Sequence, residues 1–242
     1  MLLQVARLPF KFLSLTKKSD YRYMPAYSFL TLKSNGQGIY KEKGSRFLSF
    51  AYHVSTESDI RDKIAALKSE YFDARHHCYA WMLGPEKSQY RAFDDGEPNH
   101  SAGDPILGQI RSRNLTNVLI VVVRYFGGTK LGVGGLISAY KAAAEDALNN
   151  SRVMEREVVE RITLSYDYSI TSDVMRLVKE FDMAIINQEF QDQCELTADL
   201  PLRHQQKFSE KVKLMNDLGY PPIRVTPSGS GDSDQLGVKS LP

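Results

Sequence analysis

Cysteines and long apolar runs are scarce in this 242-residue sequence. Its two cysteines, Cys78 and Cys194, are too few and too far apart for a disulfide framework, which favours a reducing compartment and predicts a cytoplasmic protein. No run reaches the roughly 18 apolar residues of a membrane-spanning helix, so we expect no membrane partner. The rest of the composition is that of a globular protein, long enough for two domains.

The chain as a whole also has no strong excess of positive or negative charge, because its formal net charge is only +2. Its distribution is uneven, however. Lys and Arg against Asp and Glu number 5 against 1 in residues 1–23, 16 against 13 in residues 24–153, and 10 against 15 in residues 154–242. We therefore expect a polyanion to meet the amino-terminal part of the chain.

The standard nucleotide-binding motifs are absent, although one segment comes close to them. Gly127 and Gly132 have the outer spacing of a P-loop, but Val133 and Gly134 occupy its Lys and Ser/Thr positions. Ile137 stands where G-x-G-x-x-G requires its third glycine. These departures argue against ATP binding of the common kinds.

The same glycine-rich segment (residues 127–135) nevertheless has the makeup of an anion site. Residues 118–123 are all Val, Leu or Ile, which predicts a buried strand, and the apolar spacing from residue 136 onward predicts a helix. Glycines between them let backbone N–H groups approach a ligand at the helix start. The candidate phosphate-binding residues here are Arg124, Gly127, Gly128, Lys130, Gly132, Gly134 and Gly135. The alternative is that the glycines serve a tight turn and close helix packing.

Further basic and aromatic residues add to this candidate site. Lys43 and Arg46 flank a turn at Gly44, so two basic side chains can accompany a backbone that contacts phosphate. Tyr125 and Phe126 either stack on bases or belong to the core at the end of the strand.

Asp94, Asp95 and Glu97 form a dense acidic cluster with three possible uses. The carboxylates can hold Mg²⁺ or act as a general base, or they can belong to a solvated turn. The third possibility is that they fix Arg124 or Lys130 by ion pairing.

The run His76, His77 and Cys78 also invites a metal interpretation. Only His76 and Cys78 share a side of a strand, and no second Cys/His pair follows at zinc spacing. We expect a structural role for these residues, and we expect neither a metal nor a cofactor.

The periodic pattern predicts an α+β fold. Strands are expected at residues 28–32, 46–54, 77–83 and 118–123, with Gly36, Gly38 and Gly44 marking turns. Thr56 and Asp59 predict a capping-box helix start, and another helix is expected over residues 102–113. From residue 161, where Tyr166 and Tyr168 continue an alternating strand, the order strand, helix, strand, strand, helix, strand is ferredoxin-like.

These patterns divide the chain into four parts. Residues 1–23 are expected to be a poorly ordered extension or an overlong assigned start, with Met24 as a natural initiator. Residues 24–153 and 154–226 are expected to form two domains. The Ser/Gly/Asp-rich residues 227–242 are expected to form a flexible tail.

Three motifs in order resemble the signature of the IMPACT/YigZ family. They are Asp94-Asp-Gly-Glu-Pro98, Ala102-Gly-Asp-Pro-Ile-Leu107 and Arg124-Tyr-Phe-Gly-Gly-Thr-Lys-Leu-Gly-Val-Gly-Gly-Leu136. The resemblance covers about residues 27–226 and implies a ribosomal protein S5 domain 2-like domain followed by one like the carboxy-terminal domain of elongation factor G. Asn99-His100-Ser101 departs from the run of small residues that many members carry, which puts contacts through that turn in doubt.

Three functional hypotheses follow from the residues and the resemblance. The first is nucleic acid binding: a protein that binds RNA or the ribosome and modulates translation through phosphate contacts of the glycine-rich segment. The second is a regulator that docks on translation factors or kinases without touching RNA. The third is a Mg²⁺-dependent phosphate-handling enzyme that uses the acidic cluster.

Overall fold

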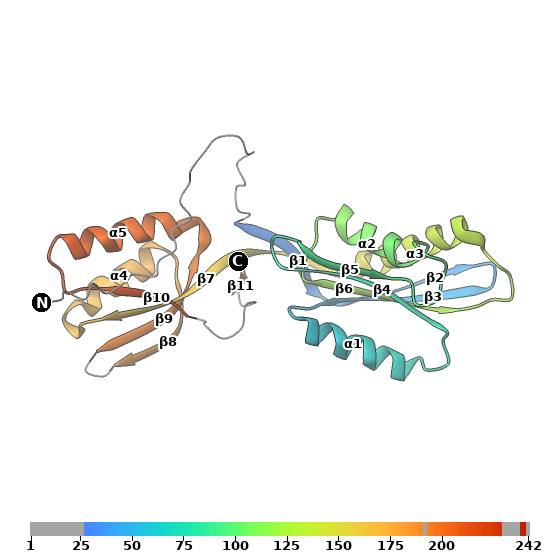
Figure 1. Cartoon of the computed structure of the whole chain (residues 1–242), viewed down its shortest axis with the longest axis horizontal. Coiled ribbons are helices and arrows are strands. Elements are labelled where there is room, and N and C mark those ends of the chain that lie inside the picture. Colours follow the sequence, from blue (N-terminus) through green and yellow to red (C-terminus); the bar gives the residue numbers. More distant parts are fainter. Residues whose placement is uncertain (1–26, 191–192, 229–237, 241–242) are drawn as a thin grey trace, which may run out of the picture.

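The chain folds into two lobes joined by one long strand, β7 (Arg152–Tyr166), as Figure 1 shows. The computed structural model describes residues 27–190, 193–228 and 238–240, so the expected extension 1–23 lies outside it. Within the described residues there are two antiparallel sheets and five α-helices. The α+β fold class predicted from the sequence is therefore confirmed. In this part of the chain, no helix is both long and apolar enough to cross a membrane.

The first lobe is a five-stranded sheet between helices, with strand order β2-β3-β6-β4-β5. Helix α1 covers one face of the sheet, and α2 and α3 cover the other (Figure 1). Its elements are β2 (Gly36–Glu42), β3 (Ser45–His53), α1 (Glu57–Glu70), β4 (His76–Leu83), β5 (Gln89–Phe93), α2 (Gly103–Ser112), β6 (Val118–Tyr125) and α3 (Gly132–Asn149). The short edge strand β5 was not expected, because its sequence is largely polar and exposed.

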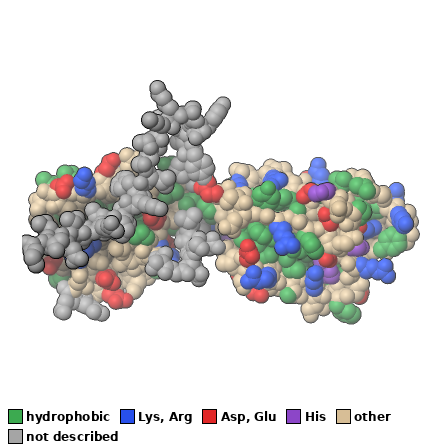
Figure 2. All heavy atoms as spheres, in the orientation of Figure 1, with side chains coloured by type: hydrophobic (Ala, Val, Ile, Leu, Met, Phe, Trp, Pro, Cys, Tyr) green, Lys and Arg blue, Asp and Glu red, His purple; other side chains and the backbone are tan. Residues whose placement is uncertain are grey.

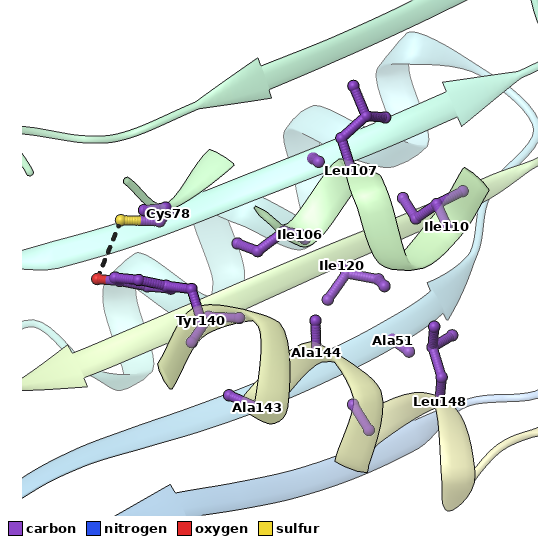
Figure 3. Packing of buried hydrophobic residues seen from close by; sticks show 14 of the residues in the cluster. Ala51, Cys78, Ile106, Leu107, Ile110, Ile120, Tyr140, Ala143, Ala144 and Leu148 are labelled. Atoms are coloured by element: carbon purple, nitrogen blue, oxygen red, sulfur yellow. Dashed lines mark hydrogen bonds between the residues drawn. The ribbon is translucent and has the colours of Figure 1, made fainter. Parts of the chain in front are cut away.

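Local sequence signals position the helices of this lobe. Thr56 and Asp59 form the predicted capping box at α1, with both reciprocal hydrogen bonds present. Ile60 and Leu67 of α1 pack on the sheet, where both are almost fully buried. Figure 3 shows the opposite core, where Ile106 and Ile110 of α2 pack beside Ala144 of α3.

Gly36 and Gly38 do not mark turns, as the sequence analysis expected, but lie within β2. They allow α3 to approach this strand closely. A Cβ on Gly36 would lie 2.1 Å from the carbonyl oxygen of Ala147, and a Cβ on Gly38 would lie 2.6 Å from its nitrogen. Small residues on both elements thus bring helix and strand together, a use of glycine that the local sequence does not distinguish from a turn.

The second lobe contains the elements expected from the sequence in the expected order. After β7 come α4 (Thr171–Glu180), β8 (Ala184–Phe190), β9 (Cys194–Pro201), α5 (Gln205–Asp217) and β10 (Arg224–Pro227). Its sheet has the order β10-β7-β9-β8, and both helices cover one face (Figure 1). Tyr168 corrects the expected strand: β7 ends at Tyr166, and Tyr168 lies in the 3₁₀ turn Tyr168–Ile170 with 70% of its surface exposed.

Strand β7 connects the lobes, because its partners come from distant parts of the chain. Its first half pairs with β1 (Ser28–Ser34), and its second half pairs with β9 and β10. The boundary expected between residues 153 and 154 therefore falls inside a strand. Within the expected tail, Val238–Ser240 form β11 and also pair with β7.

Candidate nucleic-acid interface

The glycine-rich segment begins where the central strand of the first lobe ends. Strand β6 lies between β3 and β4, and all its residues from 118 to 123 have no exposed surface. Arg46 of β3 pairs with Tyr125, and His76 of β4 pairs with Arg124. Because β6 is held on both sides, the position of the segment that follows is fixed by the sheet. Figure 1 shows this end of the lobe on the side away from β7.

The turn between β2 and β3 packs directly against the glycine-rich segment. Lys43 and Gly44 have φ values of 46° and 80°, which is the backbone of a tight two-residue hairpin. The N–H of Gly127 donates to Oγ of Ser45 at 3.1 Å. A Cβ on Gly127 would lie 1.9 Å from the carbonyl carbon of Gly44. The structure thus brings together two segments that the sequence analysis singled out separately.

Three other glycines of the segment, Gly128, Gly132 and Gly134, differ from Gly127 in having open space beside them, whereas a Cβ on Gly135 would lie 3.1 Å from Cβ of Leu131. Gly128 and Gly132 have φ values of 87° and 73°, a region that favours glycine. Apart from its chain neighbours and the adjoining backbone of α3, a Cβ on Gly128, Gly132 or Gly134 would meet no described atom within 4 Å. Close packing, one of the two interpretations left open by the sequence, therefore applies to Gly127. It gives no account of these three glycines.

The amino terminus of α3 lies within this open region. Leu131 occupies the N-cap position, so no side chain caps the first turn, and the first turn contains no acidic residue. The first backbone N–H groups of a helix lack partners inside the helix and carry a partial positive charge. Such a terminus can accept an oxyanion, provided that positive side chains lie near it.

Three basic residues predicted for the site lie at this end of the lobe. Lys43, Arg46 and Lys130 are all exposed. The guanidinium carbon of Arg46 lies 5.1 Å from the centre of the Tyr125 ring, and the Tyr125 hydroxyl donates to Asp73 at 2.7 Å. Figure 2 shows Lys and Arg side chains spread over the first lobe, including the end remote from β7.

Arg124, predicted to contact phosphate, does not reach the surface. Only 7% of its side chain is exposed, and its Nη1 donates to Oε1 of Glu97 at 2.6 Å. Its guanidinium carbon lies 5.4 Å from the ring centre of Phe47 and 5.7 Å from that of Phe126. A buried cation needs a paired anion, and Glu97 supplies it. Arg124 is therefore a positioning residue beneath the segment.

Each carboxylate of the acidic cluster has a structural partner. Asp94 accepts hydrogen bonds from the backbone N–H groups of Ala102 and Gly103 at 2.9 and 2.8 Å, which caps α2 in place of a side chain at Ala102. Asp95 accepts from the N–H of His77 at 2.7 Å. Within the described residues, no group of three His, Cys, Asp or Glu side chains is placed to hold a metal ion.

Tyr140 and Cys78 extend the buried network to α3 and β4. The Tyr140 hydroxyl donates to Oε1 of Glu97 at 2.9 Å. The Cys78 thiol donates to the Tyr140 hydroxyl at 3.3 Å (Figure 3). Burial is the main cause that raises the pKa of Cys78 and of Tyr140 well above their usual ranges. The thiol is therefore a structural group, as expected from its place in a strand.

Sequence reasoning missed Tyr140, Ser45 and Phe47 as supports of this site. Tyr140 was assigned only to the apolar face of a helix, and neither Ser45 nor Phe47 was singled out. The available signal for Tyr140 was a hydroxyl at a position predicted to be buried, since buried hydroxyls need a partner. His76 is fixed beside the acidic turn, where its Nδ1 lies 2.9 Å from the carbonyl oxygen of Asp95.

Comparison with known proteins supplies the family. The Impact N-terminal domain matches residues 43–148, a range that includes the acidic cluster and the glycine-rich segment. The IMPACT family member YigZ of Escherichia coli (strain K12) is 35% identical over 172 residues, which cover 70% of this chain and 84% of YigZ. The chain belongs to the IMPACT family.

Two further comparisons show how far the likeness to IMPACT proteins extends. The protein IMPACT homolog of Saccharomyces cerevisiae is 34% identical over 96 residues, which are 38% of this chain and 36% of the yeast protein. A crystal structure described as that of a hypothetical protein matches 85% of this chain and 100% of its own, with a TM-score of 0.63 at 28% identity. That match is too long to be confined to one lobe.

His100 occupies the turn in which this chain departs from many IMPACT members. Its φ of 64° lies in the left-handed region, which glycine adopts most readily and which His adopts more often than most other residues. The side chain is 81% exposed, and its Nδ1 lies 2.6 Å from Oδ2 of Asp104. The N–H of His100 still donates to Asp94 at 2.9 Å. The larger side chain thus faces solvent, while the turn keeps its backbone contact.

Proposed function

We propose that this protein binds RNA or the ribosome in the cytoplasm and modulates translation, with phosphate contacts made through the glycine-rich segment. The IMPACT family is linked to the regulation of translation. The observation that carries the RNA-binding proposal is the uncapped amino terminus of α3. Exposed Lys130 lies two residues before this helix, and exposed Lys43 and Arg46 lie at the β2–β3 turn, which packs against Gly127.

The backbone of the segment supports this proposal. Open space at the Cβ positions of Gly128, Gly132 and Gly134 leaves room for a phosphate oxygen to approach the backbone near the start of α3. A non-glycine residue at Gly128 or Gly132 would also be strained by the positive φ. The glycines of the segment therefore suit a backbone that must approach a ligand.

The charge distribution favours the same end of the molecule. Residues 24–153 carry 16 basic against 13 acidic side chains, whereas residues 154–242 carry 10 against 15. A polyanion is therefore attracted to the first lobe and repelled by the second.

We also propose the finer domain assignment that the sequence suggested. The order β7-α4-β8-β9-α5-β10, with β9 between β7 and β8, supports a ferredoxin-like second domain. The first lobe is proposed to be ribosomal protein S5 domain 2-like, an assignment that rests on the family resemblance. Because domains of both kinds occur in translation factors, this assignment is consistent with a role of the protein at the ribosome.

A second candidate function is docking on another protein without RNA contact. Phe126, Val133 and Ile137 expose 57%, 53% and 39% of their surfaces in the segment and the first turns of α3. Exposed apolar residues that lie together are typical of protein interfaces. The enzyme hypothesis has less support, because Asp94, Asp95 and Glu97 each hold another part of the fold.

The experiment that tests RNA binding is a salt titration. The affinity of the full chain for a labelled single-stranded RNA is measured by fluorescence anisotropy at several salt concentrations, for wild type and Lys130→Ala. Loss of one phosphate contact should weaken binding and make the slope of log affinity against log salt shallower by about 0.7. Lys213→Ala is a matched control, because Lys213 is an exposed lysine on α5 in the other lobe.

The competing outcomes are distinct. Equal losses in Lys130→Ala and Lys213→Ala would indicate nonspecific attraction, and the glycine-rich segment would lose its proposed role. A wild-type protein with no measurable affinity for RNA or ribosomes at low salt would contradict the proposal and favour protein docking. Thermal unfolding of each variant confirms that the fold is intact.

A further inference from the structure

The aromatic ring of Phe126 is exposed at the point where β6 meets the glycine-rich segment. It exposes 57% of its surface, although it directly follows β6, the most buried strand of the lobe. An aromatic ring left in water does not contribute the apolar burial that stabilises a core. An exposed ring at this position is therefore a candidate for contact with a ligand.

The ring of Phe126 lies within cation–π distance of a buried arginine, Arg124. The Arg124 guanidinium carbon lies 5.4 Å from the ring centre of Phe47 and 5.7 Å from that of Phe126, and Glu97 accepts a 2.6 Å hydrogen bond from Nη1 of Arg124. Glu97 is itself held by the Tyr140 hydroxyl at 2.9 Å. Cation–π attraction to a buried guanidinium therefore supports Phe126 from below. A ring that is already ordered loses little further entropy when a ligand stacks on it.

The surroundings of Phe126 suit both the base and the phosphate of a nucleotide. Gly127 and Gly128 follow directly, and Lys130 and the start of α3 provide positive charge on the same segment. Lys43 lies in the adjoining β2–β3 turn, which contacts Gly127, and Arg46 lies at the start of β3. An aromatic face for a base next to a basic backbone site for a phosphate is the arrangement by which proteins hold single strands.

We propose that Phe126 is a stacking platform for an unpaired base of single-stranded RNA whose adjoining phosphate lies on the glycine-rich segment. The inference rests on the proposed RNA-binding function and narrows its ligand, because bases inside a duplex are stacked on each other and offer no free face. Arg124 and Glu97 act as positioning residues, since they hold the platform without touching the RNA.

The test compares two substitutions of Phe126 in the full chain. Phe126→Leu keeps an apolar side chain of similar reach but removes the flat ring, and Phe126→Trp keeps a ring. Binding is measured with a single-stranded 12-nucleotide oligo(A) and with a duplex RNA of the same length. We expect Phe126→Leu to weaken oligo(A) binding by about 5- to 150-fold, to leave duplex affinity within about twofold, and to leave the salt slope unchanged.

Phe126→Trp gives a direct optical signal of stacking. The natural chain has one tryptophan, Trp81, which is 9% exposed, so the emission of an added exposed indole can be followed by difference. We expect Phe126→Trp to bind oligo(A) at least as tightly as wild type, with its emission quenched on binding. Inorganic phosphate should not quench it, because phosphate occupies only the neighbouring part of the site.

The outcomes separate this inference from the function on which it rests. If Lys130→Ala lowers the salt slope but Phe126→Leu binds oligo(A) like wild type, RNA binding stands and the stacking platform is overturned. An equal loss for oligo(A) and duplex also overturns stacking. If wild type binds neither RNA, the proposed function fails as well. If wild type binds a protein but neither RNA, the proposed RNA binding and the stacking platform are both overturned.

Discussion

Gly127 and Gly44 meet backbone to backbone, with the carbonyl carbon of Gly44 only 1.9 Å from where a Cβ on Gly127 would stand. At this contact the β2–β3 turn packs against the glycine-rich segment. It makes Gly127 a packing glycine, in contrast to Gly134 in the first turn of α3, around which space is open.

The first prediction compares these two glycines. Gly127→Ala should lower the free energy of unfolding by about 1–3 kcal/mol or more, because a methyl group would collide with backbone that cannot move aside. Gly134→Ala should raise it by up to about 1 kcal/mol, because alanine is the better helix former and meets no other atom. Urea unfolding of both variants measures the difference, and an unchanged midpoint for Gly127→Ala would contradict the close contact.

The second prediction concerns the buried ion pair of Glu97 and Arg124. Glu97→Ala should destabilise the fold by about 3–5 kcal/mol, because it leaves the Arg124 charge buried without its partner. The double variant Glu97→Leu with Arg124→Met should be more stable than Glu97→Ala, because neither charge remains. Urea unfolding measures the stability of both variants. A double variant no more stable than Glu97→Ala would argue that the unpaired Arg124 charge is not the main cause of the destabilisation.

How much the sequence predicted depends on how local each signal was. Thr56 and Asp59 lie three residues apart, so the capping box of α1 was readable from the chain alone. Arg124 and Glu97 are 27 residues apart, and nothing in either neighbourhood told which charge would pair with which. Gly36 was misread as a turn because its packing partner, Ala147, lies on a distant helix. The glycine-rich segment was found as a candidate site, but the division between packing and open glycines required coordinates.

The third prediction concerns the thiols. Both Cys78 and Cys194 are fully buried, and burial raises the pKa of Cys78, so thiolate at that position is scarce near neutral pH. In the native protein at pH 8, a thiol reagent such as Ellman's reagent should react slowly with both. In denaturant, the two cysteines of the chain should react quickly. Fast labelling of one thiol per native chain would show that the core around Cys78 or around Cys194 opens readily.

The fourth prediction concerns pH. Burial is the main cause that lowers the pKa of His77 below its ordinary 6.5, with Lys68 lowering it further and Asp95 opposing. Its Nε2 is buried without a hydrogen-bond partner among the described residues. The unfolded chain therefore takes up a proton more readily than the folded one, so stability should fall as pH drops from about 6.5 towards 5.

Replacement of His77 checks that assignment. His77→Phe should reduce the loss of stability between pH 6.5 and 5, as measured by urea unfolding at several pH values. His100→Gln serves as the control, because His100 is exposed and should change that dependence little. An unchanged pH dependence in His77→Phe would assign the effect to another group, of which His53, whose pKa burial also lowers, is the first to examine.

The pairing of β1 with β7 has a consequence for the order in which a nascent chain can fold. Ser28 pairs with Glu157, so β1 leaves the ribosome long before the strand that it needs. Strands β2, β3, β4 and β6 can assemble meanwhile, since their partners all precede β7 in the chain. Until β7 is synthesised, β1 remains without its ladder partner, and the same strand then supplies an edge for β9 and β10. Synthesis of residues 152–166 is thus the step that closes the first lobe and starts the second.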